Sequence, residues 1–152
     1  MSRLLQVAVM LGVTMTGMTL PSQATAQDKR TKFEIFQAEI KPAPGLTETA
    51  KPGSSEKLYL PKSPSLTNED VAEAKSGKDN NGSPVVEITF TKEGAKKMKE
   101  LCENHLQKPM AILVDGKVIC APNIRAVISE KGIISLGNAE EVERIVKGMN
   151  GK

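Results

Sequence analysis

Aromatic residues are scarce in this chain: its 152 residues include no Trp, one Tyr and three Phe. Nucleic-acid-binding proteins ordinarily present a basic stripe and aromatic platforms on which bases stack. Here 21 Lys and Arg residues nearly balance 18 Asp and Glu residues, giving a net charge of +3. The composition therefore argues against nucleic acid as a partner. Tight protein interfaces concentrate their energy in Trp, Tyr and Arg, so any protein binding is expected to be weak.

Potential catalytic and metal-binding residues are equally few. His105 is the only histidine, whereas a zinc site normally recruits several His or Cys side chains at short spacing. Cys102 and His105 have the spacing of neighbours on a helix and could in principle act as a nucleophile and its base. However, Cys102 belongs to the apolar face, where a thiol acts as a small hydrophobe. Asp115 could be considered as a general acid or base. However, it precedes Gly116 in a predicted tight turn, and the turn alone explains an aspartate at this position. With no phosphate-binding loop or nucleophile elbow, the sequence predicts no enzyme, no metal and no cofactor.

Only one long apolar run is present, and it lies at the N-terminus. Arg3 precedes the apolar stretch from Leu4 to Val13, which is shorter than the ~20 residues of a membrane-spanning helix. Ala24-Thr25-Ala26 supplies the small residues that a signal peptidase reads. We therefore expect a signal peptide over residues 1–26, cleaved after Ala26, and an exported protein, periplasmic or secreted, without a transmembrane span.

The two cysteines suggest a disulfide, because exported proteins mature in an oxidising compartment. Cys102 is predicted on a helix and Cys120 in a strand beneath it. A bridge closing about 18 residues would add roughly 3 kcal/mol to the stability. Two separate buried thiols are the alternative, and mass measurement with and without reductant distinguishes the two.

Residues 27–65 are predicted to form N-terminal strands around a loop. The alternation from Thr31 to Ile40 indicates a strand. Proline, glycine and serine gather between Lys41 and Glu56, a composition typical of a loop. A short strand over residues 57–60 follows and ends at Pro61.

Residues 66–151 alternate between helix and strand signals. Thr67 is predicted to cap a helix of about two turns that ends by Gly77. Asn81-Gly82 predicts a hairpin turn into a strand over residues 85–90. Thr91 caps a longer amphipathic helix, whose apolar positions recur at helical spacing up to Leu106.

The apolar segments 110–114 and 117–121 flank Asp115-Gly116, which predicts a type I′ hairpin. Both faces of this hairpin are apolar, so we expect it in the centre of a sheet. A strand over residues 133–136 and a last helix capped by Asn138 complete the pattern. The predicted fold is α+β: a two-layer sandwich of a mixed or antiparallel sheet and about three helices, with residues 27–152 forming one compact unit.

Several motifs in this order resemble the head subdomain of the first periplasmic domain of SecD and fused SecDF, membrane accessory proteins of the bacterial Sec export machinery. The motif residues are Thr91, Glu93, Gly94 and Ala95 at the helix start, and Asp115, Gly116, Ala121 and Pro122 in the hairpin. The segments Leu66–Val71 and Asp79–Pro84 are similar to the elements that precede them. The resemblance covers residues 66–151. Cys120 stands where the family commonly has Ser, and Ala139 where it often has Phe.

This resemblance implies a SecD-head-like domain in an exported, non-enzymatic binding module. We expect it to bind extended polypeptide weakly, through an exposed strand edge or an apolar groove beside a helix, with the loop Lys41–Glu56 as a flexible rim. The alternative is a structural component of an envelope assembly whose partner is a folded protein.

Overall fold

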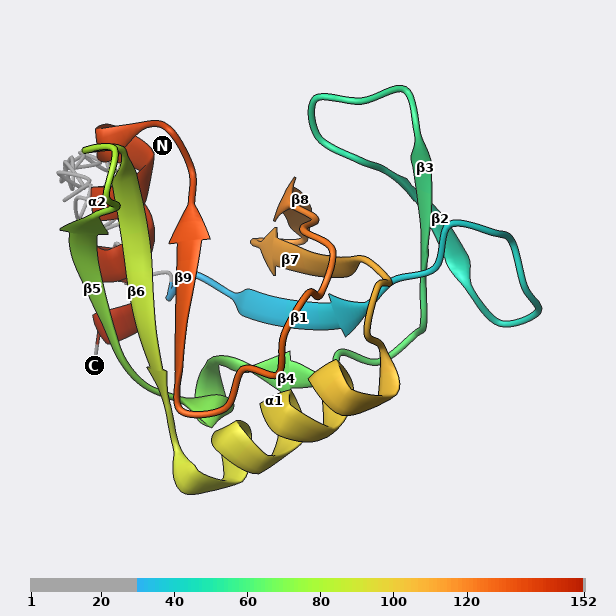
Figure 1. The fold of residues 1–152 in the computed structure, drawn as a ribbon. Coiled ribbons are helices and arrows are strands. Elements are labelled where there is room, and N and C mark those ends of the chain that lie inside the picture. Colours follow the sequence, from blue (N-terminus) through green and yellow to red (C-terminus); the bar gives the residue numbers. More distant parts are fainter. Residues whose placement is uncertain (1–29, 152) are drawn as a thin grey trace, which may run out of the picture.

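The computed structural model describes residues 30–151, so the predicted signal peptide and its cleavage site after Ala26 lie outside the described residues. Figure 1 shows two main sheets, a small separate hairpin and two α-helices. In chain order the elements are β1 (Phe33–Gln37), β2 (Thr47–Ala50), β3 (Lys57–Leu60), β4 (Leu66–Thr67), the 3₁₀ turn η1 (Asn68–Asp70), β5 (Val71–Lys78), β6 (Pro84–Phe90), α1 (Lys92–Asn104), β7 (Met110–Val114), β8 (Lys117–Cys120), β9 (Lys131–Ser135) and α2 (Ala139–Asn150).

The first main sheet has the strand order β4-β1-β7-β8, and all its pairs are antiparallel. Its β7–β8 turn is the predicted type I′ turn, since Asp115 and Gly116 both have positive φ angles of 52° and 80°. The Asp115 amide donates to the Lys32 carbonyl at 2.8 Å, and the Lys32 amide donates to Asp115 Oδ1 at 2.9 Å. The turn thus bonds to the chain just before β1.

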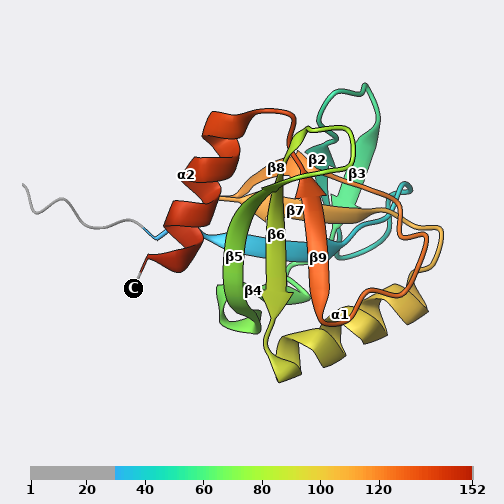
Figure 2. The same cartoon turned by 60° about the vertical axis from the view of Figure 1, so that its left-hand side comes forward.

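The second main sheet has the order β5-β6-β9, again antiparallel. In Figure 1 its strands run across those of the first sheet, with α1 below both. Figure 2 shows α2 lying beside β5 and β6, where Val142 and Ile145 are buried. At Gly148, α2 also lies against the chain just before β1, where a β-carbon would overlap the Thr31 side chain.

The main core lies between the two sheets and the two helices. It is made of apolar side chains on the facing sides, including Ile35, Ile112, Ile88, Met98 and Val142. A second core lies on the other side of the first sheet, under the β2–β3 hairpin, and includes Phe36, Leu58, Leu60, Leu113 and Val118. Apolar residues therefore alternate between two cores along β1 and β7, as expected of strands that are buried on both faces.

The predicted helix between Thr67 and Gly77 is wrong. The capping signal is present, because the Asp70 carboxylate accepts a hydrogen bond from the Thr67 amide at 2.9 Å. However, it closes one 3₁₀ turn, after which Val71–Lys78 forms β5. The fold is α+β as predicted, with two α-helices and this turn instead of three helices.

Three smaller predictions also need correction. The segment Lys41–Glu56 is not entirely loop, because Thr47–Ala50 forms β2 and pairs with β3. The β7–β8 hairpin is only half central, since β7 lies between two strands and β8 lies at the edge of the sheet. The hairpin between β5 and β6 is present, but only Gly82 of the Asn81-Gly82 pair has a positive φ angle.

Within residues 30–151, neither α-helix is long and apolar enough to cross a bilayer.

Candidate functional site

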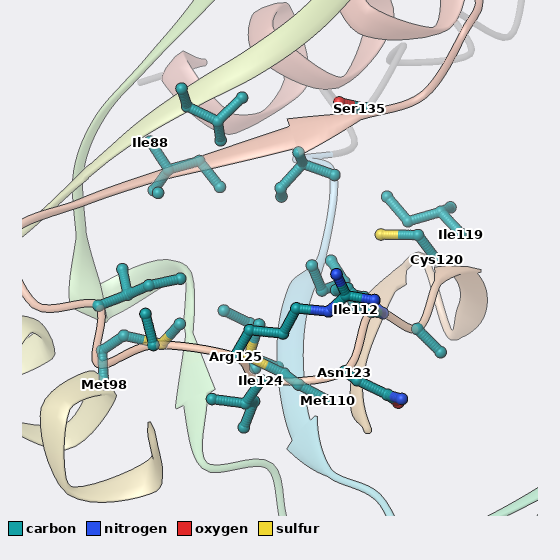
Figure 3. A pocket seen from close by; sticks show the side chains of 18 of the residues that line it. Ile88, Met98, Met110, Ile112, Ile119, Cys120, Asn123, Ile124, Arg125 and Ser135 are labelled. Carbon is teal, nitrogen blue, oxygen red and sulfur yellow. The ribbon is translucent and has the colours of Figure 1, made fainter. Parts of the chain in front are cut away.

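A cavity of about 630 Å³ opens between the two main sheets. Its walls come from β1, β6, β7, β8 and β9, from α1, and from the segment 121–130 that joins β8 to β9. Figure 3 shows side chains from these elements pointing into one space. The apolar residues that line it include Ile35, Ile88, Phe90, Met98, Met110, Ile112, Ile119, Ile124, Ile128 and Ile134. An apolar cavity of this size falls within the range of ligand-binding pockets.

Two strand edges that pair with no further strand of the described chain border the cavity. β8 and β9 are the last strands of their sheets, and both contribute residues to the cavity wall. The Phe90 amide donates to the Glu130 carbonyl at 2.9 Å, and inward-facing groups alternate along an antiparallel strand. Lys131, Ile133 and Ser135 of β9 therefore direct their backbone N–H and C=O groups away from β6. These groups are available to an added strand.

The opposite edge of the second sheet is partly covered. There, the Asn150 side chain of α2 accepts a hydrogen bond from the Ala74 amide at 3.1 Å and donates to the Ala74 carbonyl at 2.6 Å. The side chain thus occupies the position that another strand would take along β5. The available edge of this sheet is the one next to the cavity.

The predicted rim Lys41–Glu56 contributes two residues, Lys51 and Pro52, to the cavity lining. They lie in the connection between β2 and β3, which rises above the first sheet in Figure 1. The Lys51 ammonium donates to Glu56 Oε2 at 2.6 Å, and the Lys51 amide donates to the Glu56 carbonyl at 3.1 Å. These two bonds close the connection on itself and hold its base next to the cavity.

Cys102 and Cys120 are both free thiols in the structure. Cys102 is buried in the main core on α1, and Cys120 lines the cavity from β8. Burial raises the pKa of the Cys120 thiol to about 12, so the group is protonated and unreactive as a nucleophile at neutral pH. The disulfide between them stays a prediction.

His105 is buried and belongs to a separate cluster, whose other members, Glu39 and Lys108, are half-buried and exposed. Its Nε2 atom lies 3.2 Å from Glu39 Oε1, and Lys108 Nζ lies 2.8 Å from the same oxygen. The Lys108 hydrogen bond, and to a lesser extent that of His105, lowers the pKa of the Glu39 carboxyl, although partial burial opposes this shift. Glu39 also exchanges two backbone hydrogen bonds with Tyr59 of β3, both at 2.9 Å. The cluster therefore joins the end of α1 to the β2–β3 hairpin.

Because the pKa of Glu39 is depressed in the folded state, its contribution to stability is present above the ordinary value of 4.5 and is lost as the pH falls through the lower folded value. We expect the free energy of unfolding to decline by a fraction of a kcal/mol over this acidic window. The decline should be smaller in Glu39→Gln and unchanged in Glu100→Gln, which alters an exposed carboxylate on α1. Urea titrations at a series of pH values measure this, and equal declines in all three proteins would contradict it.

The motif residues at the start of α1 form a structural joint. The Thr91 hydroxyl accepts a hydrogen bond from the Gly94 amide at 3.0 Å and so caps the helix. The Thr91 amide donates to the Asp70 carbonyl at 2.9 Å, and the Ala95 amide donates to the Thr91 carbonyl at 2.8 Å. Glu93 is exposed in the first turn, where its charge suits the helix dipole. The motifs over residues 66–71 and 91–95 thus meet in space.

The hairpin motif contributes to both structure and cavity. Asp115 and Gly116 form the turn described above, whereas Ala121 and Pro122 line the cavity. The Pro122 carbonyl accepts a hydrogen bond from the Met110 amide at 2.9 Å, which holds the cavity wall against β7. The cavity itself was not predicted as a set of residues. The available signal was the group of apolar residues Ile124, Ala126 and Ile128 in a segment without strand or helix periodicity.

The described residues show no metal centre: among residues 30–151, no three His, Cys, Asp or Glu side chains lie close enough together to hold a metal ion. The buried side-chain nitrogen and oxygen atoms of this part of the chain all have hydrogen-bond partners. The cavity lining itself is mostly apolar, so an apolar group placed there would be held by burial.

The chain is similar to known proteins over most of the described region. It is 38% identical over 89 residues to the protein translocase subunit SecDF of Thermus thermophilus. This match covers 55% of this chain and 12% of that protein. It is 40% identical over 73 residues to the protein translocase subunit SecD of Rhodobacter capsulatus. This second match covers 47% of this chain and 13% of that protein. The chain thus spans only a small part of the length of these curated relatives.

Solved structures share the fold. A crystal structure of SecDF in a super-membrane-facing form matches with a TM-score of 0.63 at 28% identity, covering 80% of this chain and 19% of that one. A second structure, described as a membrane component SecDF that enhances protein export, matches with the same score and identity and is covered to 63%. The model of the family described as SecDF, P1 head subdomain, matches residues 45–147. This chain therefore belongs to the SecDF P1 head subdomain family.

Proposed function

We propose that this chain is an exported, non-enzymatic binding module that holds extended polypeptide weakly in the cavity between its two sheets. The observation that carries the proposal is the apolar cavity bordered by the free edges of β8 and β9. Membership in the SecDF P1 head subdomain family supports it, since a related structure is described as a component that enhances protein export. We extend the proposal to location and place the protein in the periplasm or outside the cell.

Binding combines two kinds of contact. An extended segment pairs its backbone with the free N–H and C=O groups of β9 at Lys131, Ile133 and Ser135, which requires no particular sequence. Alternate side chains of the segment then point toward the cavity, where they bury apolar surface against Ile128 and Ile134. Because the backbone contacts are general and the cavity is apolar, many unfolded polypeptides satisfy both requirements. Folded proteins satisfy neither, because their apolar segments are already buried.

Filling the cavity mouth should weaken this binding. Ala126 lines the cavity and is exposed, so Ala126→Trp narrows the entrance without replacing a core residue. We expect a loss of about tenfold in affinity for unfolded polypeptide. Ala72→Trp is the matched control, because Ala72 is an exposed residue of β5, at the other edge of the second sheet. Fluorescence anisotropy with a labelled, permanently unfolded protein measures both variants.

Two results would contradict the proposal. One is the absence of saturable binding by the wild-type chain at about 50 μM. The other is an equal effect of the two tryptophan substitutions. Capture of a single folded envelope protein, together with indifference to unfolded chains, would instead support the alternative of a structural component.

A further inference from the structure

The charges around the cavity are all of one sign. Among the lining residues that belong to the described range 30–151, only Lys51 and Arg125 are charged, and none is Asp or Glu. The Lys51 ammonium is already bonded to Glu56 at 2.6 Å. Arg125 therefore supplies the available charge at the cavity wall.

Arg125 has no acidic partner among residues 30–151, and its side chain is exposed. By contrast, Arg144 on α2 lies 3.7 Å from both Asp115 and Glu141. In Figure 3 the Arg125 side chain extends from the 121–130 segment across the view of the cavity. A guanidinium in this place can meet a ligand in the cavity.

The backbone next to Arg125 is firmly held. Ile124 is 4% exposed. Its amide donates to the Lys108 carbonyl at 2.9 Å, and its carbonyl accepts from the Gln107 amide at 2.8 Å. The start of the Arg125 side chain is therefore fixed relative to the cavity, while its guanidinium remains free to adjust.

We propose that the cavity selects polypeptide segments in which an apolar stretch is accompanied by a carboxylate, and that Arg125 is the residue that determines this selectivity. The inference rests on the proposed function and specifies its substrate class. The carboxylate can be an Asp or Glu side chain or the end of a chain, because the guanidinium fork pairs with either in the same bidentate way.

The physical basis is the combination of an apolar wall and one cation. Apolar side chains in the cavity supply affinity through burial and do not distinguish charge. A carboxylate beside them gains the attraction of Arg125, and within residues 30–151 it meets no acidic lining residue that would repel it. A segment that carries a lysine at the same position places two cations together near a surface of lower dielectric constant. Charge therefore modulates a binding energy that the apolar residues provide.

The test uses four labelled peptides of about ten residues, enough for one strand. Three share a central Val- and Ile-rich run and an amidated C-terminus, and they carry Glu, Gln or Lys immediately after the run. The fourth ends at this position with a free carboxylate. With the wild-type chain we expect the Glu and free-carboxylate peptides to bind about fivefold more tightly than the Gln peptide, and the Lys peptide more weakly still. The differences should shrink in high salt because the guanidinium is exposed.

Three variants assign the effect to Arg125. Arg125→Gln should bind the Glu, Gln and Lys peptides alike, and Arg125→Glu should prefer the Lys peptide. Lys96→Gln removes one exposed positive charge on α1 and should leave the wild-type order intact. Reversal of preference by Arg125→Glu is a readout that a merely structural role would not produce.

The outcomes separate this inference from the function on which it rests. If the wild-type chain binds the Glu, Gln and Lys peptides equally, the selectivity is overturned while polypeptide binding stands. If Arg125→Gln weakens all four peptides by the same factor, Arg125 does not determine selectivity. If none of the peptides binds and unfolded protein does not bind either, the proposed function itself fails.

Discussion

Replacing Gly94 with alanine is expected to lower the free energy of unfolding by about 3 kcal/mol. The direction is opposite to the usual effect, because alanine in a helix is ordinarily more favourable than glycine by about 1 kcal/mol. Gly94 is buried in the first turn of α1 and lies against η1. A β-carbon there would stand 2.9 Å from the carbonyl carbon of Asp70 and closer still to its oxygen.

The collision cannot be relieved cheaply, because the obstacle is backbone. The Asp70 carbonyl accepts the Thr91 amide at 2.9 Å, and the Asp70 carboxylate is bonded to the Thr67 amide and to Lys97 Nζ at 2.9 Å and 2.8 Å. Asp70 itself is 4% exposed. Moving η1 away from α1 therefore breaks several hydrogen bonds of a buried residue at once, each of which is costly to leave unmade.

Gly132→Ala provides the control for Gly94→Ala. A β-carbon at Gly132 would meet the Phe90 ring at 3.5 Å, which is an ordinary van der Waals contact. We expect its effect to lie within about 0.5 kcal/mol of zero. Urea unfolding followed by circular dichroism measures both variants, and an equal or greater stability of Gly94→Ala than of wild type would show that the contact between η1 and α1 is not as close as described.

Features encoded by neighbouring residues were predictable from the sequence. The β7–β8 turn needs two residues with positive φ, and Asp115-Gly116 supplies them. The start of α1 needs a side-chain acceptor for a free amide, and Thr91 supplies it. In both places the local signal and the tertiary structure agree, so the prediction is confirmed.

The error over residues 67–77 shows where local signals fail. The capping residues are real, but they end after one turn, and β5 forms from a sequence that contains Ala74 and other residues of low strand propensity. Its conformation is set by pairing with β6 along its length, and by the Asn150 side chain that bonds to Ala74. Here the contacts with residues distant in sequence outweigh the local helix signals, and no local sequence pattern predicts these contacts.

The candidate site was out of reach for a related reason. Ile88, Ile112 and Ile134 have the alternation of ordinary core residues, and nothing in their own segments distinguishes the wall of a cavity from a filled core. The cavity exists because the two sheets cross and the segment 121–130 closes one side of the space between them. That Arg125 lies at the cavity wall follows only from the position of this segment in the folded structure. The prediction of a groove or a free strand edge thus came from the family resemblance.

Asn68 is the site of the second large effect: Asn68→Ala should lower the free energy of unfolding by about 2 kcal/mol. The Asn68 side chain accepts a hydrogen bond from the Phe33 amide at 2.7 Å and donates to the Thr31 carbonyl at 2.9 Å. It thereby continues the pairing of β1 beyond the two residues of β4, at the point where the backbone turns into η1. Alanine leaves both backbone groups without this partner, and both residues are buried.

Hydrogen exchange makes the effect of Asn68→Ala specific. The Phe33 amide should lose more protection than the other amides of β1, because its partner is removed directly, whereas the neighbouring pairs with β7 remain. Asn80→Ala, an exposed asparagine in the β5–β6 connection, should change neither the stability nor the exchange at Phe33. If the Phe33 amide stays as protected in Asn68→Ala as in the wild-type chain, the side chain is not what completes the strand. A loss of protection confined to this amide and its surroundings would show that the Asn68 side chain provides the hydrogen bonds that one more residue of a paired strand would otherwise make to β1.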